Sequence, residues 1–253
     1  MFWPDINTIR NFYLSPLGNI AIENIAERIF AIWPDIKQVQ KAKSSEYVAG
    51  IGYACPYFSK TINVDDKTAD NVLLQNMFCI MPAAQGASFW PKNYMNRTLL
   101  AKEYELPFAD EQFDKILIIH ALEHTNDTRH FMREIWRVLK PNGKIIIIVP
   151  NRIGLWAHAE HTPFGSGKTF STEQLKVLLT DGMFKPTNFD TALHFFPSQF
   201  SFVQKLSSTF DKFGRKFFKP CGGIVIAEAT KQLYAATPDK VSLKSKKLVA
   251  AVD

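Results

Sequence analysis

The run "KIIIIVP", residues 144–150, constrains the fold more than any other stretch of the chain. Its four consecutive isoleucines and a valine place apolar, β-branched side chains on both faces of an extended strand. A strand that is buried on both faces belongs to a parallel sheet covered by helices. A similar run, "FDKILIIH" at residues 113–120, lies upstream. The residues between the two runs have apolar side chains at helical spacing, which predicts a β-α-β unit.

The rest of the chain continues this alternation. The residue patterns predict further strands at 46–51, 77–81, 185–197 and 221–232, and helices at 18–33, 127–140, 171–184 and 199–218. Asp127 is the expected N-cap of one helix, with Pro141, Asn142 and Gly143 as its stop, and Ser171 with Gln174 forms a capping box for the next. The long stretch at 83–98 is expected to be a loop. We therefore predict an α/β fold with a doubly wound sheet.

Composition sets the broad class of the protein. Hydrophobic residues make up 46% of the chain and charged residues 21%, as is usual for a soluble globular protein. We expect a single domain over residues 1–234, with a helical lead-in at 1–45, and a basic tail at 235–253. No run is long enough to cross a bilayer, no secretory signal is visible, and the three cysteines are far apart, which favours a reducing cytoplasmic location. The net charge of +6 is a mild excess that argues against a nucleic-acid-binding role.

Residues 105–151 carry a resemblance to a known family. They contain Leu-Pro-Phe before an acidic turn, Phe-Asp at a strand start, a His-x-Leu-Glu-His strand exit, and a helix and strand joined by Arg-Glu-Ile-x-Arg-Val-Leu-Lys-Pro-x-Gly. This segment resembles the central half of class I S-adenosylmethionine-dependent methyltransferases, in a bacterial branch similar to methyltransferase type 11. The resemblance implies a seven-stranded, mostly parallel, Rossmann-like sheet and S-adenosylmethionine as the cofactor.

The cofactor loop of this family falls on "VAGIGYACPYF", residues 48–58, where the usual pattern is Asp-x-Gly-x-Gly-x-Gly. Gly52 matches the first glycine, while Ala54 and Pro56 replace the other two. Gly50 stands where the acid that holds the amino end of the cofactor is expected, and no acid follows the second strand. The resemblance implies the following cofactor-binding residues: Gly50, Gly52, Tyr53, Ala54, Met81, Pro82, Glu103, Glu105, Leu106, His120 and His124. A Gly52→Val change is expected to block cofactor binding and to leave the circular dichroism near wild type.

Two further regions are candidates for the chemistry. His120 ends the strand that faces the methyl position in this fold, and a histidine there can act as a general base. The alternative is that His120 and His124 only complete the strand exit. The long segment at 152–171 is expected to form a substrate lid through Trp156, His161 and Lys168, or else a structural loop. Its histidines and Glu160 find no matching cluster elsewhere in the sequence, so no metal site is predicted.

The sequence thus predicts a cytoplasmic methyltransferase that uses S-adenosylmethionine. The methyl acceptor, a small molecule or a protein, and the oligomeric state are not specified by the sequence. The alternative is a non-catalytic descendant that keeps the methyltransferase fold and serves as a binding or scaffold partner. Loss of the two acids from the cofactor motif is the feature that keeps this alternative open.

Overall fold

The computed structural model describes residues 3–37, 46–61, 76–92, 95–198 and 219–233. Its centre is a seven-stranded sheet with the order β3-β2-β1-β4-β5-β7-β6. The strands are β1 (Val48–Gly52), β2 (Met77–Pro82), β3 (Thr98–Ala101), β4 (Phe113–Ile119), β5 (Leu139–Pro150), β6 (Phe184–Ala192) and β7 (Ile224–Lys231).

Neighbouring strands from β3 to β5 are parallel, and only β7 runs antiparallel to its neighbours β5 and β6. The prediction of a doubly wound, mostly parallel, seven-stranded sheet is therefore confirmed. From β1 the chain continues to β2 on one side, whereas β4 pairs with β1 on the other. The carboxyl ends of β1, β2 and β4 consequently meet at a switch point, where ligands bind in sheets of this kind.

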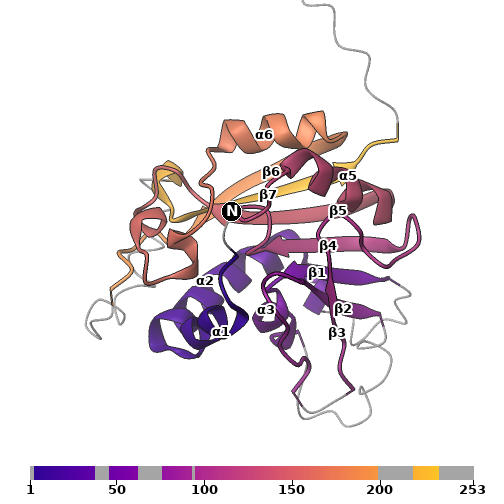
Figure 1. The fold of residues 1–253 in the computed structure, drawn as a ribbon. Helices are drawn as coiled ribbons and strands as arrows, with labels where there is room; N and C mark the ends of the chain where they lie inside the picture. The colour runs from indigo at the N-terminus through magenta and orange to yellow at the C-terminus, as the bar shows by residue number, and fades with distance from the viewer. Residues whose placement is uncertain (1–2, 38–45, 62–75, 93–94, 199–218, 234–253) are drawn as a thin grey trace, which may run out of the picture.

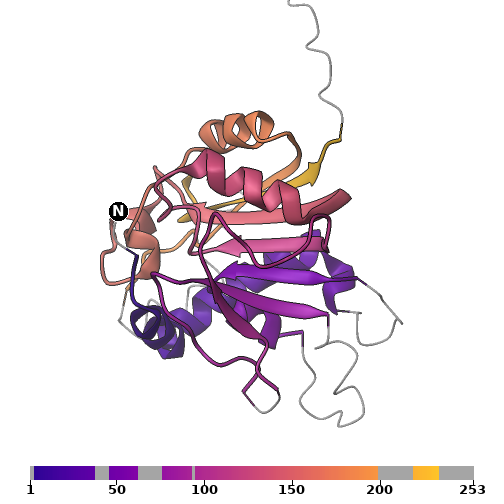
Figure 2. The same ribbon diagram turned by 45° about the vertical axis from the view of Figure 1, so that its right-hand side comes forward.

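Helices cover both faces of the sheet (Figure 1 and Figure 2). One face carries α1 (Ile6–Leu14), α2 (Pro16–Ile32) and α3 (Cys55–Ser59), and the other carries α5 (Thr128–Val138) and α6 (Thr172–Asp181). The isoleucine run serves both layers, as predicted. Ile146 and Ile148 pack in the core under α1 and α2, whereas Ile145 and Ile147 pack in the core under α5 and α6.

The predicted caps are confirmed, but one helix ends earlier than expected. The Asp127 carboxylate accepts hydrogen bonds from the backbone N–H groups of Arg129 and His130, both at 3.0 Å. The Ser171–Gln174 capping box is also present. However, α5 stops at Val138 and β5 begins at Leu139, so Pro141 to Gly143 lie inside the strand. Leu139 already pairs with Phe113 of β4, and the residue before a proline disfavours the helical conformation.

Other differences lie at the edges of the fold. The sequence did not predict α1 as a separate helix or β3 as a strand; β3 is a four-residue edge strand whose first three positions are only partly covered or exposed. The helix predicted at 199–218 and the tail at 235–253 lie outside the described residues. No helix in the described part of the chain is long and apolar enough to cross a membrane.

Candidate functional site

Gly52 closes the gap between β1 and β4 at the switch point. It has φ +85°, and its neighbour Tyr53 donates a backbone hydrogen bond to Ile119 O at 3.0 Å. A Cβ atom added at Gly52 would lie 2.0 Å from the same carbonyl oxygen. Glycine is therefore required here by the approach of the two strands, whether or not a ligand binds. This geometry argues against the expectation that Gly52→Val would leave the circular dichroism near wild type, because the side chain would collide with the backbone of β4.

The position expected to hold an acid has no room for one. A Cβ atom added at Gly50 would lie 2.4 Å from the Ala54 Cβ and 2.8 Å from the Phe58 ring. The short helix α3 begins at Cys55 and packs directly on β1, with Pro56 in its first turn. Glycine at position 50 thus allows α3 to pack closely, and a carboxylate for the cofactor has to come from elsewhere.

The exit from β2 supplies a polar side chain that the sequence analysis missed. Met81 is buried, and Pro82 ends the strand and accepts a backbone hydrogen bond from Gln85 N at 2.9 Å. The side chain of Gln85 is only 1% exposed and reaches across the switch point to donate from Nε2 to His120 O, at 3.2 Å. The only sequence signal was a polar residue in the apolar stretch "MPAAQG".

The exit from β4 brings together a histidine and a buried carboxylate. His120 has φ +55° and is completely buried, and Glu123 is 1% exposed. His120 Nδ1 lies 3.5 Å from Glu123 Oε1, while Glu123 Oε2 accepts a hydrogen bond from Ala121 N at 3.1 Å. Burial alone would raise the pKa of Glu123, but the imidazoles of His120 and His124 lower it below its usual value. The carboxylate is therefore charged near neutral pH, and the sequence analysis did not single it out.

The N-terminal segment covers the carboxyl ends of β1, β2 and β4, which together are called the rim below. Ile6 N donates to Gln85 O at 2.9 Å, and the Tyr13 hydroxyl lies 2.7 Å from His120 Nε2 and 2.9 Å from the Tyr57 hydroxyl. The Tyr13 ring also stacks on Tyr53, with 5.6 Å between ring centroids. Burial raises the pKa of Tyr13 well above its usual value, so its hydroxyl is a neutral hydrogen-bonding group. Tyr53 thus lies at the rim and packs against α1, and its contact with a cofactor stays a prediction.

Two residues of the segment predicted to be a lid, Trp156 and Lys168, hold it to the rest of the protein by hydrogen bonds. Trp156 is completely buried and donates from its indole N–H to Phe195 O at 2.8 Å. Lys168 donates from its backbone to Glu123 O at 2.8 Å and from Nζ to Thr125 O at 2.9 Å. His161 lies farther out, with Nε2 3.0 Å from Pro197 O. Lys168 is therefore next to the β4 exit, Trp156 belongs to the core, and the lid role stays a prediction.

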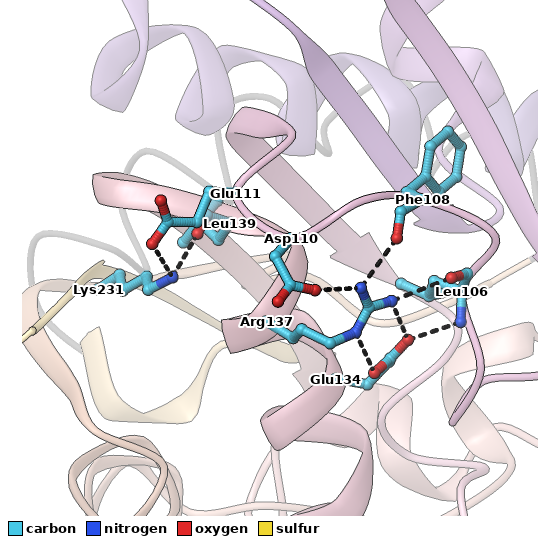
Figure 3. Close-up of polar contacts among 8 residues, drawn as sticks. All are labelled: Leu106, Phe108, Asp110, Glu111, Glu134, Arg137, Leu139 and Lys231. Atoms are coloured by element: carbon cyan, nitrogen blue, oxygen red, sulfur yellow. Dashed lines mark hydrogen bonds and ion pairs between the residues drawn. The ribbon is translucent and has the colours of Figure 1, made fainter.

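The Leu106 turn is held by an ion pair on α5 (Figure 3). Leu106 N donates to Glu134 Oε1 at 2.7 Å, and Arg137 forms two hydrogen bonds with the same carboxylate, at 2.7 and 2.9 Å. Arg137 also donates to Leu106 O, Phe108 O and Asp110 Oδ1, at 3.0, 2.8 and 2.7 Å. This contact set, the Arg137 clamp, fixes the loop that precedes β4.

The two acids predicted to reach the adenine differ in their surroundings. Glu105 is largely exposed and pairs with Lys102 at 3.3 Å, and Glu103 is half-buried on the same turn. Neither contacts His120, Gln85 or Glu123, so the structure does not bring these acids into the buried rim. Their role toward a cofactor stays a prediction.

Other features of the described residues lie away from the rim. A groove of about 810 Å³ runs between α5 and α6 and includes Arg133, Trp136 and Met183. Near the edge of this groove, Lys231 at the end of β7 donates to Leu139 O, at the start of β5, at 2.6 Å (Figure 3). The Lys231 ammonium also lies over the Trp136 ring. Within the described ranges, no three His, Cys, Asp or Glu side chains are grouped to hold a metal ion.

Tyr13→Phe is expected to lower the free energy of unfolding by about 1–3 kcal/mol, because it leaves buried polar atoms of His120 and Tyr57 without their partner. Urea denaturation followed by circular dichroism measures the change. Tyr47→Phe is the matched control, since the Tyr47 hydroxyl makes no hydrogen bond within the described part of the chain, and its cost should stay within about 0.5 kcal/mol. Equal stabilities of Tyr13→Phe and wild type would show that the phenol does not hold α1 on the rim.

Comparisons with known proteins agree with this geometry. The profile of the family described as "Methyltransferase domain" matches residues 89–147, which include β4, α5 and the His120 exit. An uncharacterized protein of Methanocaldococcus jannaschii is 32% identical over 54% of this chain and 62% of its own length. A demethylmenaquinone methyltransferase of Renibacterium salmoninarum is 36% identical over 28% of this chain and 26% of its own length. The chain thus spans less than two thirds of each of these relatives.

The fold is also found in solved structures. A Thermotoga maritima S-adenosylmethionine-dependent methyltransferase, described as a possible histamine N-methyltransferase, superposes with a TM-score of 0.57 at 19% identity. That alignment covers 90% of this chain and 96% of the other. A second such methyltransferase, from Archaeoglobus fulgidus, has a TM-score of 0.50 at 16% identity and covers 81% of this chain and 94% of the other. At these identities the likeness establishes the fold.

Proposed function

We propose that this chain is a class I S-adenosylmethionine-dependent methyltransferase, which transfers a methyl group from S-adenosylmethionine to a hydroxyl or amine of an acceptor. The family and the fold imply S-adenosylmethionine as the cofactor. The observation that carries the proposal is the rim itself. The family match covers β4 and its exit, and the sheet places that exit beside Gly52 and Gln85.

The residues at the rim fit this cofactor through their hydrogen-bonding groups. Three buried side-chain atoms there have no hydrogen-bond partner within the described residues, namely Gln85 Oε1, His120 Nδ1 and Glu123 Oε1. A buried polar atom without a partner costs about 1–3 kcal/mol, so such atoms are expected to meet a ligand or water. The cofactor carries hydroxyl and ammonium donors that suit the two oxygen atoms. Gly52, Ala54, Met81 and Leu106 would supply the close backbone and apolar walls.

When bound, the cofactor supplies a methyl group on a sulfonium, which is already a good leaving group. The chain then has to position the acceptor, exclude water and take up its proton. His120 is the residue suited to the last task, because its Nε2 already faces a hydroxyl, that of Tyr13, at 2.7 Å. In the proposed reaction the acceptor O–H or N–H takes the place of the Tyr13 hydroxyl and gives its proton to Nε2.

Calorimetric titration of the purified protein with S-adenosylmethionine and S-adenosylhomocysteine tests the proposal. The usual acids are missing, so we expect dissociation constants in the micromolar to submillimolar range, roughly 10- to 100-fold weaker for each charge-assisted hydrogen bond that is not replaced. A matching rise in melting temperature should accompany binding. If neither ligand gives heat or thermal stabilisation at millimolar concentration, the enzyme proposal fails and a scaffold role takes its place.

A further inference from the structure

Glu123 is a buried carboxylate whose own chain does not fully satisfy it. It is 1% exposed, and its pKa is lowered, so it carries its charge inside the protein. Oε2 accepts one hydrogen bond, from Ala121 N, whereas Oε1 has only the His120 ring at 3.5 Å and accepts no hydrogen bond from the described residues. A carboxylate has room for about four donors, and a buried charge is costly unless it is paired. The imidazoles of His120 and His124 offset part of this charge, and Oε1 still has room for a cationic donor from a ligand.

Gln85 adds a second acceptor beside His120. Its amide nitrogen donates to His120 O, and this contact fixes the orientation of the amide, because two oxygen atoms facing each other would repel. The amide oxygen consequently points away from the carbonyl, and it is buried with no hydrogen-bond partner in the described part of the chain.

We propose that the Glu123 carboxylate, assisted by the Gln85 amide oxygen, binds the amino group of the methionine part of S-adenosylmethionine. The inference rests on the proposed function and assigns to these two residues the role of the acid that Gly50 has no room to carry. An ammonium group offers three N–H donors and a positive charge, which match one buried carboxylate oxygen and one buried amide oxygen. The negative charge that pairs with the ligand's ammonium group thus comes from a residue after β4 instead of a residue at the end of β1.

A competing role for Glu123 is to orient the His120 ring without touching the cofactor. The two roles differ in which ligand atoms they affect. S-adenosylhomocysteine carries the amino-acid part, whereas 5′-methylthioadenosine has the same nucleoside but lacks that part. A residue that binds the amino group contributes to the affinity for the first ligand only, and a residue that merely orients His120 contributes to neither.

The experiment measures the dissociation constants of both ligands by calorimetry for wild type, Glu123→Gln, Glu123→Asp and the surface control Glu173→Gln. Glu123→Gln keeps the size of the side chain and an oxygen for Ala121 N, so we expect it to fold. It should weaken S-adenosylhomocysteine binding by about 10- to 100-fold, the range of a charge-assisted hydrogen bond, and change 5′-methylthioadenosine binding by less than twofold. Glu123→Asp keeps the charge and should fall between wild type and Glu123→Gln, and Glu173→Gln should equal wild type.

The ratio of the two affinities protects the test against partial misfolding, because inactive protein lowers the binding of both ligands equally. Gln85→Leu should reduce S-adenosylhomocysteine binding more than 5′-methylthioadenosine binding, by a smaller factor than Glu123→Gln. An unchanged ratio in Glu123→Gln, with wild type still binding S-adenosylhomocysteine, would overturn this inference and leave the proposed function intact. Absence of S-adenosylhomocysteine binding by the wild type would overturn both.

Discussion

Replacing Gly52 with alanine is expected to lower the free energy of unfolding by about 3–5 kcal/mol, from left-handed backbone strain and from the separation of two packed strands. The added Cβ would lie 2.0 Å from Ile119 O and 2.9 Å from His120 O, so β1 and β4 have to move apart. Backbone cannot yield as a flexible side chain does, because the same carbonyl accepts the Tyr53 hydrogen bond. Valine at this position should prevent folding altogether. Urea denaturation followed by circular dichroism measures the loss.

Gly86→Ala is the matched control for this prediction. Gly86 has φ +92°, close to the value of Gly52, but its added Cβ would meet only the Ile6 side chain, at 3.1 Å, a contact that a small shift of this side chain relieves. The control therefore carries the backbone strain, about 1–2 kcal/mol, without a collision with the sheet. If Gly52→Ala and Gly86→Ala cost the same, the close approach of β1 and β4 is not what requires glycine at position 52.

Local chemistry allowed much of the fold to be predicted from the sequence. The isoleucine run reports burial on both faces because each strand position faces one layer or the other, and Ile146 and Ile147 indeed pack in opposite cores. The caps at Asp127 and Ser171 depend on side chains within three residues of the backbone that they serve. Such signals are short-range and can be read along the chain.

The rim could be predicted only in part, because it is assembled from distant segments. The resemblance located Gly52 and His120, but Gln85 and Glu123 reach the site through contacts that no local pattern encodes. The absence of an acid at Gly50 indicated a weakened motif from sequence alone. In the structure it follows from the packing of Ala54 and Phe58 against β1, a fact of tertiary geometry.

The N-terminal lead-in shows the same limit. Its helical spacing was visible, but nothing in the spacing indicates that Tyr13 reaches His120, which is 107 residues away. The phenol closes the rim from the same face on which α2 packs against the sheet. A ligand that uses His120 Nε2 therefore has to displace the Tyr13 hydroxyl, and the cost of displacing it adds to the weak binding that the missing acids predict.

Arg137→Met is expected to lower the free energy of unfolding by about 2–4 kcal/mol at neutral pH, since removing one partner of a buried pair leaves an uncompensated charge. Glu134 is 9% exposed and would keep only Leu106 N, while Phe108 O would lose the Arg137 donor and Leu106 O would keep only Phe108 N. The value is set below the range for fully buried pairs because the Arg137 side chain is 32% exposed. Denaturation of Arg137→Met, Arg137→Lys and wild type measures it, with lysine expected in between because it cannot form the paired contacts.

Acid should shrink this difference, and the sign follows from Glu134. Burial alone would raise the pKa of its carboxyl, but the hydrogen bonds from Arg137 and from Leu106 N lower it below its usual value. A lowered pKa in the folded state contributes stability above the unfolded value of about 4.3, and this contribution disappears as the pH falls through the folded pKa. Arg137→Met removes the main cause of the lowering, so wild type and variant should converge between about pH 5 and pH 3. The double variant Arg137→Met, Glu134→Gln leaves only the exposed Asp110 without its Arg137 partner and should be more stable at pH 7 than Arg137→Met alone. If the double variant is less stable, the cost of losing Arg137 comes from the loop carbonyls and not from the buried carboxylate.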